Sequence, residues 1–164
     1  MALLPRSEQK RIDNSVDSIF LQTNMSYPKD GLLNIVNALG IKVKVINLGE
    51  FSDKVSGVIN KDHSTIYLNQ DHSPERQTFT LAHELGHYVL HNGVKLRIDK
   101  YNYQANTKEA KEETEANYFA ASLLMPKIEF MSVIENAGTV GQVAKYFGVS
   151  QTAVVNRIRW LRQN

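Results

Sequence analysis

The segment from Ser73 to His91 constrains the fold most strongly, because its residues leave little helix surface for solvent. Ser73 is a good N-cap, Pro74 suits the first helical position, and Asn92-Gly93 is a typical stop. Apolar residues recur on most sides of this predicted helix, which indicates a buried, central position. These residues are Phe79, Leu81, Ala82, Leu85, Val89 and Leu90.

Polar residues interrupt the apolar pattern of this helix at the sequence His-Glu-Leu-Gly-His, from His83 to His87. Residues four apart on an α-helix project from one face, about 40° apart, so both imidazoles can bind one cation. They supply half of a tetrahedral zinc site, and Glu84 between them lies beside the metal as a general base. Two hydrogen-bonded core histidines are the ordinary alternative, but this spacing around a glutamate favours Zn²⁺.

Composition limits the remaining chemistry. The 164-residue chain contains no cysteine, so any further zinc ligand must be His, Asp or Glu. The formal net charge of +2 is too small to indicate nucleic-acid binding from composition. Residues 1–11 lack the apolar core of a signal peptide, and no apolar run approaches transmembrane length. We therefore expect a soluble, cytoplasmic protein without a membrane partner, with its oligomeric state left open.

The rest of the chain predicts an α+β fold. Helical spacing covers residues 6–22, and a second helix follows Pro28 and ends at Gly40. Alternating or short apolar runs then predict three strands, which we expect to form a small antiparallel sheet packed on the motif helix. A polar loop is expected over 99–107. The predicted strands cover residues 41–45, 55–60 and 64–69.

A catalytic zinc site needs a third protein ligand. His91 follows His83 by eight residues, but helical rotation carries it about 80° away. The metzincin spacing requires a histidine at position 93, where the chain has Gly93, so that class is excluded. His63 and His72 lie outside the helix, where spacing does not test them.

An acidic helix from Glu112 to Met125 is the better source of this ligand. Its apolar stripe faces the core, and Pro126 limits the helix. Glu115 borders the stripe and Glu112 projects nearer its centre, so periodicity does not choose between them. The stripe consists of Ala116, Phe119, Ala120 and Leu123.

Two blocks, residues 79–91 and 115–126, resemble the ImmA/IrrE family of zinc-dependent metallopeptidases. Residues 66–69 and Arg76 also resemble this family, and the similarity spans about residues 30–160. Several members of the family act on helix-turn-helix repressors of mobile elements or stress-response systems. The resemblance therefore implies a zinc metallopeptidase whose protein substrate is such a transcriptional repressor.

The same resemblance implies a gluzincin-like site in this chain. His83 and His87 are then zinc ligands, and Glu84 activates the zinc-bound water. The third ligand is the glutamate of the Glu-Ala-Asn block, which is Glu115 in this sequence. Tyr88, His91 or a tyrosine of the 101–103 loop is a candidate for stabilising the oxyanion.

The C-terminal segment has the spacing of a helix-turn-helix: a helix over 140–147, a turn at Gly148, and a helix over 151–161 capped by Ser150. We therefore expect a zinc metallopeptidase domain over 1–128, with a helical segment over 129–164 packed on it. The predicted core of the pair is Ala144, Phe147, Val149, Val154 and Ile158.

This segment also supports an alternative function, a DNA-binding or protein-binding regulator. Three arginines make the second helix basic, but its exposed start offers only uncharged residues to base edges. A module that keeps zinc without hydrolysis is disfavoured by the intact Glu84. The arginines are Arg157, Arg159 and Arg162, and the uncharged residues are Gln151, Thr152 and Asn156.

Overall fold

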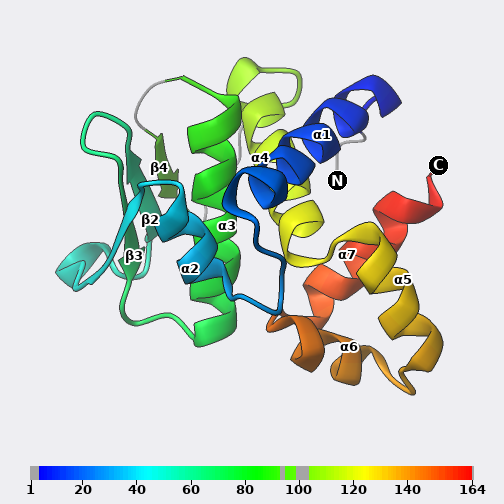
Figure 1. Ribbon diagram of the computed structural model, residues 1–164. Helices are drawn as coiled ribbons and strands as arrows, with labels where there is room; N and C mark the ends of the chain where they lie inside the picture. Colours follow the sequence, from blue (N-terminus) through cyan, green and yellow to red (C-terminus); the bar gives the residue numbers. More distant parts are fainter. Residues whose placement is uncertain (1–3, 93–94, 99–103, 164) are drawn as a thin grey trace.

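The computed structural model describes residues 4–92, 95–98 and 104–163. Helix α3 (Pro74–Leu90) runs through the middle of the molecule, with a sheet on one side and helices α1 and α4 on the other (Figure 1). The α+β class and the central position of the motif helix are therefore confirmed. The Ser73 side chain caps α3 by accepting a hydrogen bond from the Arg76 backbone N–H.

The other helices follow the predicted pattern closely, although the second one begins later than expected, at Leu32. Thr107, Thr139 and Ser150 cap their helices as Ser73 does. None of the helices among the described residues is long and apolar enough to cross a membrane. The helices are α1 (Arg6–Thr23), α2 (Leu32–Ala38), α4 (Lys108–Leu124), α5 (Lys127–Asn136), α6 (Val140–Phe147) and α7 (Gln151–Arg162).

The sheet has four strands in the order β1-β3-β2-β4. Strand β2 pairs antiparallel with β3 and β4, but β1 runs parallel to β3, so the prediction of a wholly antiparallel sheet is wrong. Strands β1 and β2 are not neighbours in the sheet. Strand β3 follows β2 through a tight turn, pairs between β2 and β1, and so runs parallel to β1. The strands are β1 (Lys42–Ile46), β2 (Val55–Asn60), β3 (Thr65–Asn69) and β4 (Lys95–Ile98).

The structure contains two short elements that the sequence did not predict. Strand β4 has no counterpart in the sequence prediction, and a short 3₁₀ helix (Gly49–Phe51) lies between β1 and β2. Of the loop predicted over 99–107, residues 99–103 lie outside the described residues, and residues 104–107 lead into α4.

The C-terminal helices share one core with the rest of the molecule. Phe147, Val154 and Trp160 belong to the same buried cluster as residues of α1, α2 and α4. The Tyr27 hydroxyl donates a hydrogen bond of 2.5 Å to the carbonyl oxygen of Phe147. The predicted helix-turn-helix core is confirmed for Ala144, Phe147, Val149 and Val154, which are buried, while Ile158 is partly buried.

Candidate metal centre

His83 and His87 meet on the buried face of α3. Both side chains are almost fully enclosed, and their Nε2 atoms lie 3.0 Å apart. This proximity follows from their spacing of four residues on a continuous helix. Two imidazole nitrogens therefore converge on one point inside the protein.

The third donor at this point is Glu113 of α4. One of its carboxylate oxygens lies 3.2 Å from His83 Nε2, and the other lies 3.0 Å from His87 Nε2. Burial by itself raises the pKa of Glu113, but hydrogen bonds from the two histidines outweigh burial and hold this pKa far below its usual value. Glu113 is therefore an anion facing two imidazole nitrogens.

These three donors fit a divalent cation such as zinc. Their ligand atoms all lie within 4.8 Å of one another. Zinc–ligand distances of about 2.0–2.1 Å in a tetrahedron place neighbouring ligand atoms about 3.3 Å apart. The observed separations of 3.0–3.2 Å are close to this value. Two neutral nitrogens and one carboxylate are also the donor set of known catalytic zinc sites.

The structure does not place Glu115 with the two histidines, so the location expected for the third ligand is wrong. Glu115 instead accepts hydrogen bonds from His91 Nε2 at 2.8 Å and Arg11 Nη2 at 3.1 Å. Glu112 forms an ion pair with Lys108 at 3.7 Å. Glu115 and Glu113 are two positions apart on the helix, about 200° around its axis, so they face different neighbours.

A signal for Glu113 was present in the sequence. Asn117, one turn after Glu113, lies on the same face of α4 and hydrogen-bonds His83. The spacing Glu-x-x-Ala-Asn therefore marks the α3-facing side of this helix better than the adjacent Glu-Ala-Asn does. The apolar stripe pointed to Glu112 or Glu115, and the family resemblance implied Glu115, so Glu113 was not considered.

Gly86 lets α3 and α4 approach closely enough for this arrangement. A Cβ atom at Gly86 would lie 3.0 Å from Phe119 Cδ1 and 3.3 Å from Ala116 Cα. A side chain at position 86 would therefore press on the Phe119 ring and on the backbone of α4 at Ala116.

Glu84 lies on the sheet-facing part of the same helix and is fully buried. Strand β2 passes close to it at Gly57, where an added Cβ would lie 3.3 Å from Glu84 Cγ and 2.6 Å from Thr80 Cγ2. The glycine therefore lets the strand pack directly against the glutamate of the motif. Glu84 is thus held by packing on a rigid helix rather than on a loop.

Hydrogen bonds behind the donors fix the orientation of both imidazoles. His83 Nδ1 lies 2.8 Å from Asn117 Oδ1, and His87 Nδ1 lies 2.9 Å from His91 Nδ1. An imidazole that offers its Nε2 lone pair to a metal carries its proton on Nδ1, so both rings donate through Nδ1. His91 then accepts at Nδ1 and donates from Nε2 to Glu115. Burial lowers the pKa of His91, against the opposing effect of Glu115, and so favours this neutral form.

The chain of contacts behind His87 ends on α1. Arg11 donates to Glu115 and also to Glu8 at 2.8 Å. The N-terminal helix is therefore linked to a candidate metal ligand through His91 and Glu115. His91 takes part in the centre behind His87 and does not join the three donors.

The other candidate residues lie elsewhere. His63 is exposed in the turn between β2 and β3, and His72 contacts Asn69 Nδ2 at 3.4 Å. The Tyr88 hydroxyl lies 3.3 Å from Ser64 Oγ, toward the sheet. Tyr101 and Tyr103 lie outside the described residues.

The arrangement of α7 differs from that of a helix poised to read DNA. Arg157 is only 2% exposed and donates hydrogen bonds of 3.1 Å to Met125 O and to Ser122 Oγ. It cannot contact a phosphate without leaving the core, so its expected contribution to a basic surface is wrong. Thr152 and Asn156 line a pocket against α3 and α4.

Comparison with known proteins gives a consistent result. The model of the family described as IrrE N-terminal-like domain matches residues 36–159. The radiation response metalloprotease IrrE of Deinococcus radiodurans is 36% identical over 104 residues, which cover 63% of this chain and 30% of that protein. The protein of the same name from Deinococcus deserti is 34% identical over 104 residues, covering 60% and 37%. The chain therefore matches only about a third of the length of these relatives.

A solved structure of a Mycobacterium tuberculosis transcriptional regulator is similar in fold. It superposes with a TM-score of 0.64 at 18% identity, over 93% of this chain and 48% of that one. At this identity the likeness concerns the fold alone.

Proposed function

Because the chain belongs to the IrrE N-terminal-like domain family, we propose that it is a zinc-dependent metallopeptidase. The observation that carries the proposal is the convergence of His83, His87 and Glu113 beside a motif glutamate on the same buried helix. Two relatives named as metalloproteases support it. We assign His83, His87 and Glu113 as the metal ligands and Glu84 as the catalytic base.

The residues of this centre divide the work of hydrolysis. His83, His87 and Glu113 would hold a zinc ion, which would supply Lewis acidity for activating water and polarising a carbonyl group. Glu84 accepts a proton from the attacking water and delivers it to the amine nitrogen as the C–N bond breaks. The carbonyl carbon gains the hydroxyl and the nitrogen gains the proton, so the reaction balances without a redox step. Asn117 and His91 keep the two imidazoles oriented throughout.

The proposed substrate is a helix-turn-helix transcriptional repressor of a mobile element or stress-response system, cleaved in the cytoplasm. The resemblance to the ImmA/IrrE family supports this choice, as do relatives named for a radiation response. We also propose that residues 1–128 carry the peptidase chemistry and that residues 129–164 form a helical segment attached to it.

Glu84→Gln tests the proposed chemistry. The variant should bind one zinc ion as the parent does, but cleave at a rate about 10²–10⁴ lower, the usual contribution of a general base. Zinc-loaded protein would be incubated with purified helix-turn-helix repressors from the source genome and with denatured casein, and products read by mass spectrometry. Glu135→Gln, an exposed glutamate on α5, is the matched control. Equal cleavage by parent and Glu84→Gln would show that the assigned base is wrong.

A further inference from the structure

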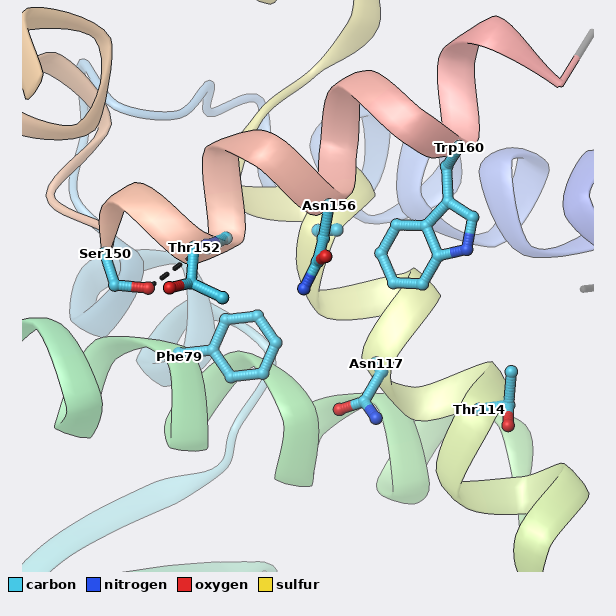
Figure 2. A pocket seen from close by; sticks show the side chains of 9 residues that line it. Phe79, Thr114, Asn117, Ser150, Thr152, Asn156 and Trp160 are labelled. Carbon is cyan, nitrogen blue, oxygen red and sulfur yellow. Dashed lines mark hydrogen bonds between the residues drawn. The ribbon is translucent and has the colours of Figure 1, made fainter. Parts of the chain in front are cut away.

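A pocket lies between helix α7 and the two helices of the metal centre. Phe79 of α3 and Asn117 of α4 form one wall, and Asn156 and Trp160 of α7 form the other (Figure 2). Figure 2 shows the six-membered ring of Trp160 turned toward Asn156. The cavity volume is about 260 Å³. We call this cavity the neutral pocket.

The neutral pocket adjoins the metal centre through one shared residue, Asn117. Asn117 belongs to both, because its Oδ1 lies 2.8 Å from His83 Nδ1. Thr114, which also lines the pocket, directly follows Glu113 in the sequence, and Phe79 precedes His83 by one helical turn. The Asn117 side chain therefore lies between the pocket and His83, and a residue next to a scissile bond held at the three donors is the candidate occupant.

A second hollow extends the pocket along α3. It has a volume of about 650 Å³, and it shares Phe79 and Ser150 with the neutral pocket. It runs between the first turn of α3 and the turn that joins α6 to α7. Together the two hollows form a groove that adjoins the metal centre at Asn117, with one wall supplied by the C-terminal segment.

The two ends of this groove differ in charge. Glu75, Arg76 and Lys145 line the far hollow. Every described residue that lines the neutral pocket is uncharged: Phe79, Ala121, Ala153 and Trp160 give it apolar surface, and asparagine, threonine and serine side chains give it hydrogen-bonding groups. Such a lining disfavours a charged occupant, because a buried charge requires a partner.

We propose that the neutral pocket receives an uncharged, mainly apolar side chain of the protein substrate, from a residue next to the scissile bond. Helix α7 is then a specificity element of the peptidase. This inference rests on the proposed function. A volume of about 260 Å³ lies just below the range of roughly 300–1,000 Å³ typical of whole small-molecule ligands, so it suits one side chain.

Cleavage of a mixed peptide library tests this preference. The zinc-loaded parent should favour leucine-like residues at one position beside the cleaved bond. Ala153→Phe narrows the pocket and should shift that position toward glycine and alanine, lowering the leucine-to-alanine ratio about tenfold or more, the scale of hydrophobic-pocket discrimination. Asn156→Asp adds a negative charge and should enrich lysine and arginine there about tenfold. The matched controls Ala38→Phe and Asn14→Asp alter exposed helix positions far from the groove and should change nothing.

Trp160 provides a readout that does not depend on hydrolysis, because it is the single tryptophan of the chain. Two peptide hydroxamates, with a leucine or an aspartate side chain, would be titrated into zinc-loaded Glu84→Gln protein. The leucine probe should change Trp160 emission and bind at least tenfold more tightly than the aspartate probe, and Ala153→Phe should remove this difference.

The outcomes separate the two proposals. Tighter binding of the leucine probe, detected by Trp160 emission, without cleavage of any substrate would overturn the peptidase function and leave the pocket assignment standing. Equal affinity for the two probes, or unchanged Trp160 emission with both, would overturn the pocket assignment whether or not cleavage occurs. An unchanged cleavage preference in both Ala153→Phe and Asn156→Asp would also overturn it.

Discussion

Helices α3 and α4 bury ionisable side chains that face one another, whereas α7 buries Arg157 among groups that accept its hydrogen bonds. At the metal centre, two imidazole nitrogens and a carboxylate converge within 4.8 Å. In α7, a backbone carbonyl and a serine hydroxyl accept the hydrogen bonds of Arg157. The comparison shows that burial alone does not identify a functional group. Donor atoms that converge on a common point indicate a cation site. A buried charged side chain whose hydrogen bonds are all made by neighbouring protein groups indicates a structural role.

Glu113→Gln should break the metal centre and give the largest effect. Structural zinc sites gain about 10–16 kcal/mol from their ligand sets, so loss of one ligand costs roughly 3–4 kcal/mol, or a few hundred-fold in zinc affinity. Competition with a chromophoric chelator measures this change. Glu112→Gln, at the preceding residue of the same helix, is the control and should stay within about threefold of the parent, since Glu112 pairs with Lys108 and is not one of the three donors. The reverse order of the two variants would remove Glu113 from the ligand set.

Arg157→Leu tests whether the buried arginine of α7 stabilises the fold. The substitution leaves Met125 O and Ser122 Oγ without their donor inside the core, and it should lower the free energy of unfolding by about 3 kcal/mol. Arg159→Leu, an exposed neighbour, should change it by no more than about 0.5 kcal/mol. Urea denaturation gives both values.

Arg159→Leu also addresses DNA binding. If α7 does not read DNA, a gel shift at low salt should show no duplex binding by the parent, and none for Arg159→Leu to weaken. Salt-sensitive binding that Arg159→Leu reduces would support the alternative of a DNA-binding regulator instead.

Glu115→Gln should have a smaller effect on the metal, because Glu115 acts through His91. Loss of this carboxylate weakens the acceptor that holds His91 Nε2, and outer contacts of this kind change metal affinity by about 10–100-fold. We expect about tenfold weaker zinc binding, together with a change in the ¹⁵N chemical shifts of the His91 ring. Lys111→Gln removes an exposed lysine that pairs with both Glu115 and Glu8, leaves the contact between Glu115 and His91 in place, and serves as control. A tenfold loss without any change at His91 would contradict the positioning role.

Gly86→Ala should give the smallest effect, and it should lower zinc affinity more than it changes stability. Alanine favours a helix over glycine by about 1 kcal/mol, which stabilises α3. Its Cβ would lie 3.0 Å from the Phe119 ring, so α4 must shift by a few tenths of an ångström. We expect the thermal stability of the metal-free protein to change little and zinc affinity to fall a few-fold. Unchanged zinc affinity would show that the α3–α4 distance does not control the donors.

The sequence by itself determined the motif helix, its cap at Ser73 and the pair His83 and His87. These features depend on local spacing along one helix, which periodicity reports directly. The helix-turn-helix spacing of α6 and α7 was also visible, because the glycine turn and the Ser150 cap are local signals.

Only the tertiary structure decided which glutamate completes the centre and what α7 faces. Glu112, Glu113 and Glu115 lie on one helix, and the choice among them depends on the rotation of α4 against α3, fixed by the contact of Gly86 with Phe119 and Ala116. Arg157 likewise looked like a surface charge until packing enclosed it. The parallel pairing of β1 with β3 was decided in the same way. Such contacts join residues far apart in the chain, so they cannot be predicted from local spacing.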